Sequence, residues 1–171
     1  MATRSIPLPA GAWLPTSDIA SWVSAQVQVK QSSGSVPSPR WLEWLFDDTT
    51  DEHIVLSFVM PQNYVSSPTL QVYYKATSAT SGTAAFEGRM SAVTDGDAQD
   101  LDADTFATVN AGSATVPATA GYLDVIAITL TNADSVAAGD HVILCLNRDV
   151  SADSVTGDLE VIGCDFRYSD V

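Results

Sequence analysis

Two stretches of residues 137–168 decide the fold: HVILCLNR at 141–148 and GDLEVIGCDFRY at 157–168. The first is a nearly continuous apolar run, and the turn Ala138-Gly139-Asp140 precedes it. The second places an apolar or aromatic residue at every other position, namely Ile162, Cys164, Phe166 and Tyr168. A period of two, in short segments that follow Gly-Asp turns, predicts β-strands.

Strand-like segments of the same kind fill the sequence from residue 41 onward. They are 41–46, 53–60, 69–77, 83–93 and 122–130, and 25–30 is a further candidate upstream. Two weaker segments, Thr105–Asn110 and Ala114–Val116, could add a hairpin. Strands at this density predict an all-β fold: a two-sheet antiparallel β-sandwich of the jelly-roll kind, or a barrel.

Residues 1–40 are predicted to form an N-terminal arm that is mostly extended. Prolines recur at positions 7, 9, 15, 37 and 39, and Gln31–Ser35 has the composition of a flexible stretch. Ser17 and Asp18 could cap one short helix within the arm. A chain of 171 residues suits one domain, so residues 41–171 are expected to be a single β-sandwich. The arm lacks the apolar run of a secretory signal, and synthesis in a cytoplasm is expected.

The charge of the chain excludes some partners. There are 7 Lys and Arg against 21 Asp and Glu, a net charge of −14, and lysines account for two of the seven cations. Phosphate contacts need clustered cations, so nucleic acid is not an expected partner. Arg4, Lys30 and Arg40 outnumber Asp18 in the arm, which is therefore slightly basic beside an acidic body. A membrane is not expected either, because no run approaches the ~20 apolar residues of a span.

The most conspicuous polar feature is the acidic stretch DGDAQDLDAD at 95–104. Calcium takes six to eight oxygen ligands, and the carboxylates that could supply some of them are Asp95, Asp97, Asp100, Asp102 and Asp104. The helix–loop–helix calcium pattern needs Gly at its sixth position and Glu at its twelfth. Counting from Asp95, Asp100 and Phe106 stand there. A solvated loop is the simpler interpretation, and no metal or cofactor is predicted.

Residues suited to catalysis do not form a recognisable set. His53 and His141 each open a strand, and the chain has no GxSxG turn, phosphate loop or dinucleotide fingerprint. The acids of the turn 47–52 could serve glycoside hydrolysis, but adjacent acids in turns are usually turn formers. Cys145 and Cys164 lie in apolar strands and are expected to be buried thiols. We predict a protein that binds other proteins and is not an enzyme.

All four tryptophans lie within the first 44 residues. Trp41 and Trp44 are three apart, so on a strand they would point to opposite faces, and one would enter the core. Trp13 could cover its own sandwich or anchor the arm on a neighbouring protein. The candidate interface residues are Arg4, Trp13, Trp22, Lys30, Arg40 and Trp44.

The stretches Ala137–Asp149 and Asp153–Tyr168 resemble the closing strand pair of small β-sandwich structural proteins of tailed bacteriophages. In these proteins a Gly-Asp turn starts a strand that ends in Arg-Asp, and a second Gly-Asp turn starts the last strand. The resemblance implies a capsid decoration or cement protein, a homotrimer that binds the major capsid protein on the outer surface of the virion. The alternatives are a phage tail or fibre module and a carbohydrate-binding β-sandwich. The last would expose a strip of aromatic side chains, for which Tyr64, Tyr73 and Tyr74 are available.

Overall fold

The computed structural model describes residues 1–16 and 22–171. In these residues the chain forms strands and two single-turn 3-10 helices. The strands of the first half are β1 (Thr3–Pro9), β2 (Leu14–Pro15), β3 (Val23–Ser24), β4 (Gln26–Gln31), β5 (Arg40–Phe46), β6 (Glu52–Val59) and β7 (Tyr64–Ala76). Those of the second half are β8 (Thr83–Val93), β9 (Asn110–Thr115), β10 (Asp124–Thr129), β11 (His141–Arg148) and β12 (Leu159–Asp170), and the helices are η1 (Ala10–Ala12) and η2 (Leu101–Ala103).

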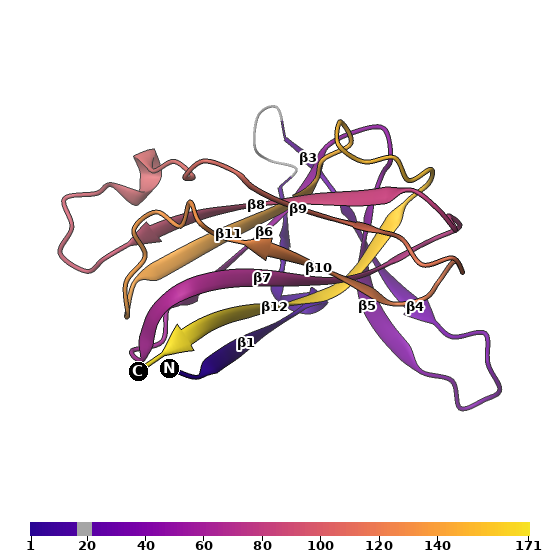
Figure 1. The fold of residues 1–171 in the computed structure, drawn as a ribbon, viewed down its shortest axis with the longest axis horizontal. Coiled ribbons are helices and arrows are strands. Elements are labelled where there is room, and N and C mark those ends of the chain that lie inside the picture. Colours follow the sequence, from indigo (N-terminus) through magenta and orange to yellow (C-terminus); the bar gives the residue numbers. More distant parts are fainter. Residues whose placement is uncertain (17–21) are drawn as a thin grey trace.

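The strands form two six-stranded sheets that pack face to face (Figure 1). Sheet A has the order β10-β7-β12-β5-β4, and β1 also pairs with β12. Sheet B has the order β2-β6-β11-β8-β9, and β3 also pairs with β6. The pairings are antiparallel except for the short β3–β6 pair. The predicted all-β, two-sheet antiparallel sandwich is confirmed.

Strand β12 organises sheet A. It pairs with β7 along its length, and on its other edge it pairs with β5 at Leu159–Val161 and with β1 at Gly163–Ser169. Its register with β7 shifts between Val161 and Gly163, so the strand changes neighbours where it is irregular. Such shifts let a strand bend without losing its pairing.

The core lies between the sheets, where every other residue of each strand is apolar. Phe46 of sheet A meets Phe86 of sheet B edge to face, with ring centroids 5.6 Å apart, and Tyr74 approaches the same ring at 5.8 Å. These rings are almost completely buried. Edge-to-face pairs of this kind add to the free energy gained by burying apolar area. Cys145 and Cys164 are free, buried thiols, as predicted.

The first forty residues are not a separate arm. Their described part supplies β1 and β4 to sheet A and β2 and β3 to sheet B. Trp13 is buried in the core of its own sandwich, so the second of its two predicted roles, an anchor on a neighbour, is wrong. The prolines do not prevent this pairing. Pro7 and Pro9 lie in β1, which pairs with β12 on one side and with no strand of the described residues on the other, so backbone N–H groups on that other side are not needed.

Two local predictions have different outcomes. The segments Thr105–Asn110 and Ala114–Val116 do not form a hairpin; one strand, β9, pairs with β8 instead. The expected short helix after Ser17 and Asp18 falls largely on residues 17–21, which lie outside the described residues. Among the described residues, no helix has the length and apolar character needed to cross a bilayer.

One fully buried cation, Arg148, closes an end of the sandwich. Its guanidinium donates to the carbonyl oxygens of Phe46 (3.0 Å), Val155 (2.8 Å) and Gly157 (2.9 Å). It also makes a bidentate pair with Asp153, at 2.9 and 3.1 Å. All five of its N–H donors therefore have acceptors. Arg148 belongs to sheet B and Phe46 to sheet A, so this one side chain links both layers.

Replacing Arg148 by Met should lower the free energy of unfolding by about 3–5 kcal/mol, because the buried Asp153 carboxylate loses its counter-ion. Urea denaturation measures the change. Arg167→Met is the matched control, since the side chain of Arg167 is 42% exposed and its pair with Asp165 lies at the surface. The control should cost no more than about 1 kcal/mol. Equal losses for the two variants would contradict the role given to Arg148.

Candidate functional site

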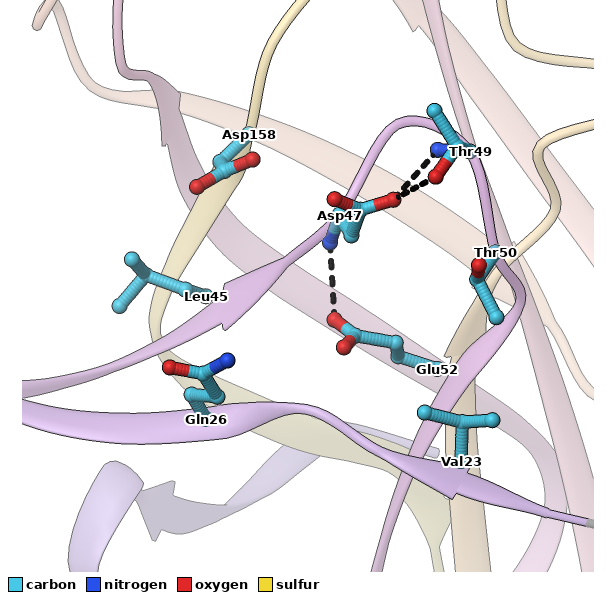
Figure 2. Close-up of a pocket in the computed structure, with 8 residues that line it drawn as sticks. All are labelled: Val23, Gln26, Leu45, Asp47, Thr49, Thr50, Glu52 and Asp158. Atoms are coloured by element: carbon cyan, nitrogen blue, oxygen red, sulfur yellow. Dashed lines mark hydrogen bonds between the residues drawn. The ribbon is translucent and has the colours of Figure 1, made fainter.

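A small acidic pocket of about 290 Å³ lies at the end of sheet A, where β5 turns into β6. Figure 2 shows the eight residues that line it, among them three carboxylates, Asp47, Glu52 and Asp158, and no basic side chain. Glu52 accepts a hydrogen bond from the backbone N–H of Asp47 at 2.8 Å. Asp47 in turn accepts from the backbone N–H (2.7 Å) and the hydroxyl of Thr49.

These contacts show that the acids of this turn have structural roles. Asp47 caps the turn through Thr49, Asp48 accepts from the N–H of Gly157 (2.5 Å), and Asp51 accepts from the N–H of Val150 (2.9 Å). Asp47 and Glu52 stabilise the turn itself, as predicted, whereas Asp48 and Asp51 bond to the connection between β11 and β12. Burial raises the pKa of Glu52, and the negative charges of Asp47 and Asp158 raise it further.

A larger pocket, of about 580 Å³, lies on the outer face of sheet A. It extends from Lys30 on β4 past Trp41 on β5, Glu160 and Ile162 on β12 and Lys75 on β7 to the segment just before β10. It therefore crosses the sheet from one edge strand to the other. The lining is completed by the end of β4 and the segments after β4, after β7 and before β10, with Gln31, Ser32, Ser33, Thr77, Gly121 and Leu123.

Beneath this pocket lies a lysine–glutamate cluster, which we define as Lys30, Glu43, Lys75 and Glu160. All but the fully buried Glu43 line the pocket. Lys75 Nζ lies 3.2 Å from Glu43 Oε2 and contacts Glu160 Oε2. Lys30 Nζ lies 3.3 Å from Glu160 Oε1 and 3.7 Å from Glu43 Oε1. Burial lowers the pKa of Lys75, and its hydrogen bond to Glu43 opposes this shift. The cluster comes from four adjacent strands, because β4, β5, β12 and β7 are neighbours.

Trp41 is the half-buried aromatic side chain of this pocket. Its indole N–H donates to Glu43 Oε2 at 2.7 Å, and Gln28 donates to Glu43 Oε1, also at 2.7 Å. The hydrogen bond fixes the ring against the outer face of the sheet. Trp44, three residues on, is buried in the core and donates to the carbonyl of Ala10 at 2.8 Å. The expectation that the two rings take opposite faces is confirmed.

A further pocket, of about 310 Å³, adjoins the pocket at Trp41. The two share Leu123 and Ile162, and beyond these the lining becomes apolar, with Pro7 and Pro9 of β1 and the ring of Tyr73. Arg167 donates to the Tyr73 hydroxyl at 3.3 Å. We call the two pockets together the outer-face groove. It has an aromatic side chain toward each end, Trp41 and Tyr73, and charged and hydroxyl side chains at the Trp41 end.

The six candidate interface residues do not form one surface. Lys30 lines the outer-face groove, and Arg40 is exposed nearby and donates to Gln31 at 2.8 Å. Arg4 pairs with Asp170 at 2.6 Å near the chain ends. Trp22 lies on the outer face of sheet B, where it stacks on His53 with ring centroids 4.4 Å apart. Trp13 and Trp44 are buried, so their prediction as interface residues is wrong.

The acidic stretch 95–104 forms an exposed loop after β8. Its carboxylates bond locally: Asp97 accepts from Thr94 N–H at 3.2 Å, Asp100 accepts from Asp102 N–H at 3.0 Å, and Asp104 accepts from the Ser91 hydroxyl. The hydrogen bond from Ser91 lowers the pKa of Asp104. Residues 1–16 and 22–171 contain no group of acids, cysteines or histidines arranged to hold a metal ion.

The sequence interpretation missed Glu43, Lys75 and Glu160. Each is a single charged residue inside an apolar strand, a pattern that is typical of a solvent-facing position. Only the strand pairing brings them together, for example Glu160 opposite Lys75. The available signal was that Glu43 and Glu160 interrupt runs of large apolar side chains, where an isolated charge needs a partner.

Comparisons with known proteins support the fold. No model of a protein family matches the chain, and no curated protein matches its sequence. Solved structures do match, and they include carbohydrate-binding modules. A non-crystalline cellulose specific module of family CBM28 matches with a TM-score of 0.52 and 11% identity, over 91% of this chain and 87% of that chain.

Two further modules match over nearly their whole lengths. The family 11 carbohydrate-binding module of Lic26A-Cel5E from Clostridium thermocellum has a TM-score of 0.50 and 13% identity, over 99% of this chain and 97% of that chain. The CBM22-1 xylan-binding domain of Paenibacillus barcinonensis Xyn10C has a TM-score of 0.50 and 12% identity, over 97% and 94%. At these identities the likeness concerns the fold alone: this chain has a β-sandwich similar to theirs.

Replacing Glu52 by Gln should raise the melting temperature at pH 7 by roughly 2–4 °C. A carboxyl whose pKa is higher in the folded chain than its ordinary 4.5 destabilises the fold once it is ionised. The penalty grows as pH rises from 4.5 through the raised pKa, and it is absent at lower pH. The gain should therefore vanish below pH 4, which calorimetry at both pH values measures. Asp95→Asn, in the exposed loop, removes the same charge and should change neither value; a lower melting temperature for Glu52→Gln at pH 7 would contradict the assignment.

Proposed function

We propose that this protein is a non-catalytic carbohydrate-binding module that holds a polysaccharide chain in the outer-face groove. The carrying observation is the fixed ring of Trp41, which lies in a groove lined by hydrogen-bonding side chains. Sugars offer an apolar C–H face and hydroxyl groups at their edges. An aromatic ring suits the first, and hydroxyl, amide and charged side chains suit the second.

The length of the groove favours a polysaccharide chain, rather than a single sugar, as the ligand. The pocket at Trp41 has about 580 Å³, and the pocket at Tyr73 adds about 310 Å³ beyond Ile162 and Leu123. Binding to a groove whose side chains are already held in place loses little conformational entropy. Here Glu43 holds Trp41, Gln28 and Lys75 at distances of 2.7 to 3.2 Å. The proteins of similar fold are named for binding non-crystalline cellulose, xylan and other carbohydrates.

The capsid decoration role predicted from the sequence gains no such support. It depended on an arm that wraps a neighbouring subunit, and the described part of residues 1–40 lies within the two sheets instead. The carbohydrate-binding alternative needed an exposed aromatic strip, for which Tyr64, Tyr73 and Tyr74 were the candidates. Tyr74 is buried in the core, so that strip does not form, and the groove instead offers the half-buried rings of Trp41 and Tyr73. The homotrimer, the major capsid protein as partner and the virion surface as location stay predictions.

Affinity electrophoresis and calorimetry against soluble polysaccharides test the proposal. The panel should hold neutral chains (xylan, mixed-linkage β-glucan, galactomannan) and acidic chains (polygalacturonate, alginate). At least one should retard the protein. Trp41→Ala should weaken that binding by about 2 kcal/mol, roughly thirtyfold, as expected for a central aromatic contact.

Trp22→Ala is the matched control, because Trp22 lies on the outer face of the opposite sheet. It should leave the affinity unchanged. Failure of every polysaccharide to bind would overturn the proposed function. Equal losses for Trp41→Ala and Trp22→Ala would place the binding elsewhere on the molecule.

A further inference from the structure

The only two lysines of the chain, Lys30 and Lys75, line the same pocket of the outer-face groove. They come from β4 and β7, which are separated in sheet A by β5 and β12. Four of the five arginines interact with acids of their own chain, as Arg4–Asp170, Arg89–Glu87, Arg148–Asp153 and Arg167–Asp165. In a protein of net charge −14, this pocket therefore concentrates two cations at one place on the surface.

The lysine–glutamate cluster is polarised across the sheet surface. The side chains of Glu43 and Glu160 are 0% and 2% exposed, whereas those of Lys30 and Lys75 are 40% and 11% exposed. The negative charges thus lie beneath the positive ones. The cluster has no net charge, but it presents its ammonium groups to the groove.

The Lys30 ammonium keeps hydrogen-bonding capacity for a ligand. It has three N–H donors, and its contacts are Glu160 Oε1 at 3.3 Å and the more distant Glu43 Oε1 at 3.7 Å. Both oxygens of Glu43 already accept short hydrogen bonds, from Gln28 and from Trp41. A ligand carboxylate could therefore accept a hydrogen bond from a free N–H donor of Lys30. Glu43 would not compete for that donor, because both of its oxygens already accept hydrogen bonds.

We propose that the outer-face groove selects acidic polysaccharides, and that Lys30 and Lys75 recognise the ring carboxylates of uronic acid units. This inference rests on the proposed function. The overall negative charge of the protein does not forbid it, because charges farther away than about 8 Å are largely screened at physiological salt. The ligand carboxylate would interact mainly with the groups of the pocket itself.

Calorimetry with an oligogalacturonate tests this, with the same oligosaccharide after reduction of its carboxyl groups to alcohols as the matched ligand. The protein should bind the acidic form at least tenfold more tightly, and raising the salt concentration should weaken that binding. Lys30→Gln should lose most of the preference. Arg89→Gln, on the opposite sheet, has the same net charge and should keep it.

The outcomes separate this inference from the function on which it rests. Equal affinity for the acidic and reduced forms, or binding of neutral chains alone, overturns the selectivity and leaves the carbohydrate-binding function standing. Absence of binding to any polysaccharide overturns both. The comparison of the two ligands uses the unaltered protein, so it decides the question even if Lys30→Gln does not fold.

Discussion

The guanidinium of Arg148 is the constraint on which one whole end of the sandwich depends. It donates hydrogen bonds to the carbonyl of Phe46 in sheet A. It also donates to the carboxylate of Asp153 and the carbonyls of Val155 and Gly157, which lie in the connection into β12. Asp153 in turn accepts from the backbone N–H of Ala85 in β8 at 3.1 Å. A buried cation is tolerated because every one of its donors is used. These hydrogen bonds set the direction in which the chain enters β12, which is the central strand of sheet A.

The outer-face groove also contains buried charges that are stabilised by partners of opposite charge, but here some of the partners reach the solvent. Glu43 and Glu160 are buried charges, and they are stable there because Lys30 and Lys75 neutralise them. At Arg148 the charges are completely enclosed, so the interaction is structural. In the groove one partner of each pair reaches the solvent, so the same kind of interaction leaves positive groups able to meet a ligand. Under the proposed function, the polar residues that hold Trp41 in place also determine which ligands fit.

Much of the fold was predictable from local patterns, since the strand 83–93 begins and ends with an alternating stretch and the strand 141–148 with a nearly continuous apolar run. The opposite orientations of Trp41 and Trp44 follow from the same period of two. The arm was mispredicted because β1 has few local signals; its partner, β12, lies more than 150 positions away in the sequence. The groove was missed for a related reason: Glu43, Lys75 and Glu160 become neighbours only through strand order, which no local pattern encodes.

The central position of β12 also bears on how the molecule is made. Since β1, β5 and β7 all pair with a strand that the ribosome adds after them, sheet A cannot close while residues 159–170 are still being synthesised. Until then β7 and β5 expose unpaired edges, which are prone to pair with other chains. The many long-range contacts of such a topology slow its formation. Sheet A is therefore expected to form completely only once residues 159–170 have been synthesised, and the high negative charge of the chain disfavours pairing of its open edges with those of other copies.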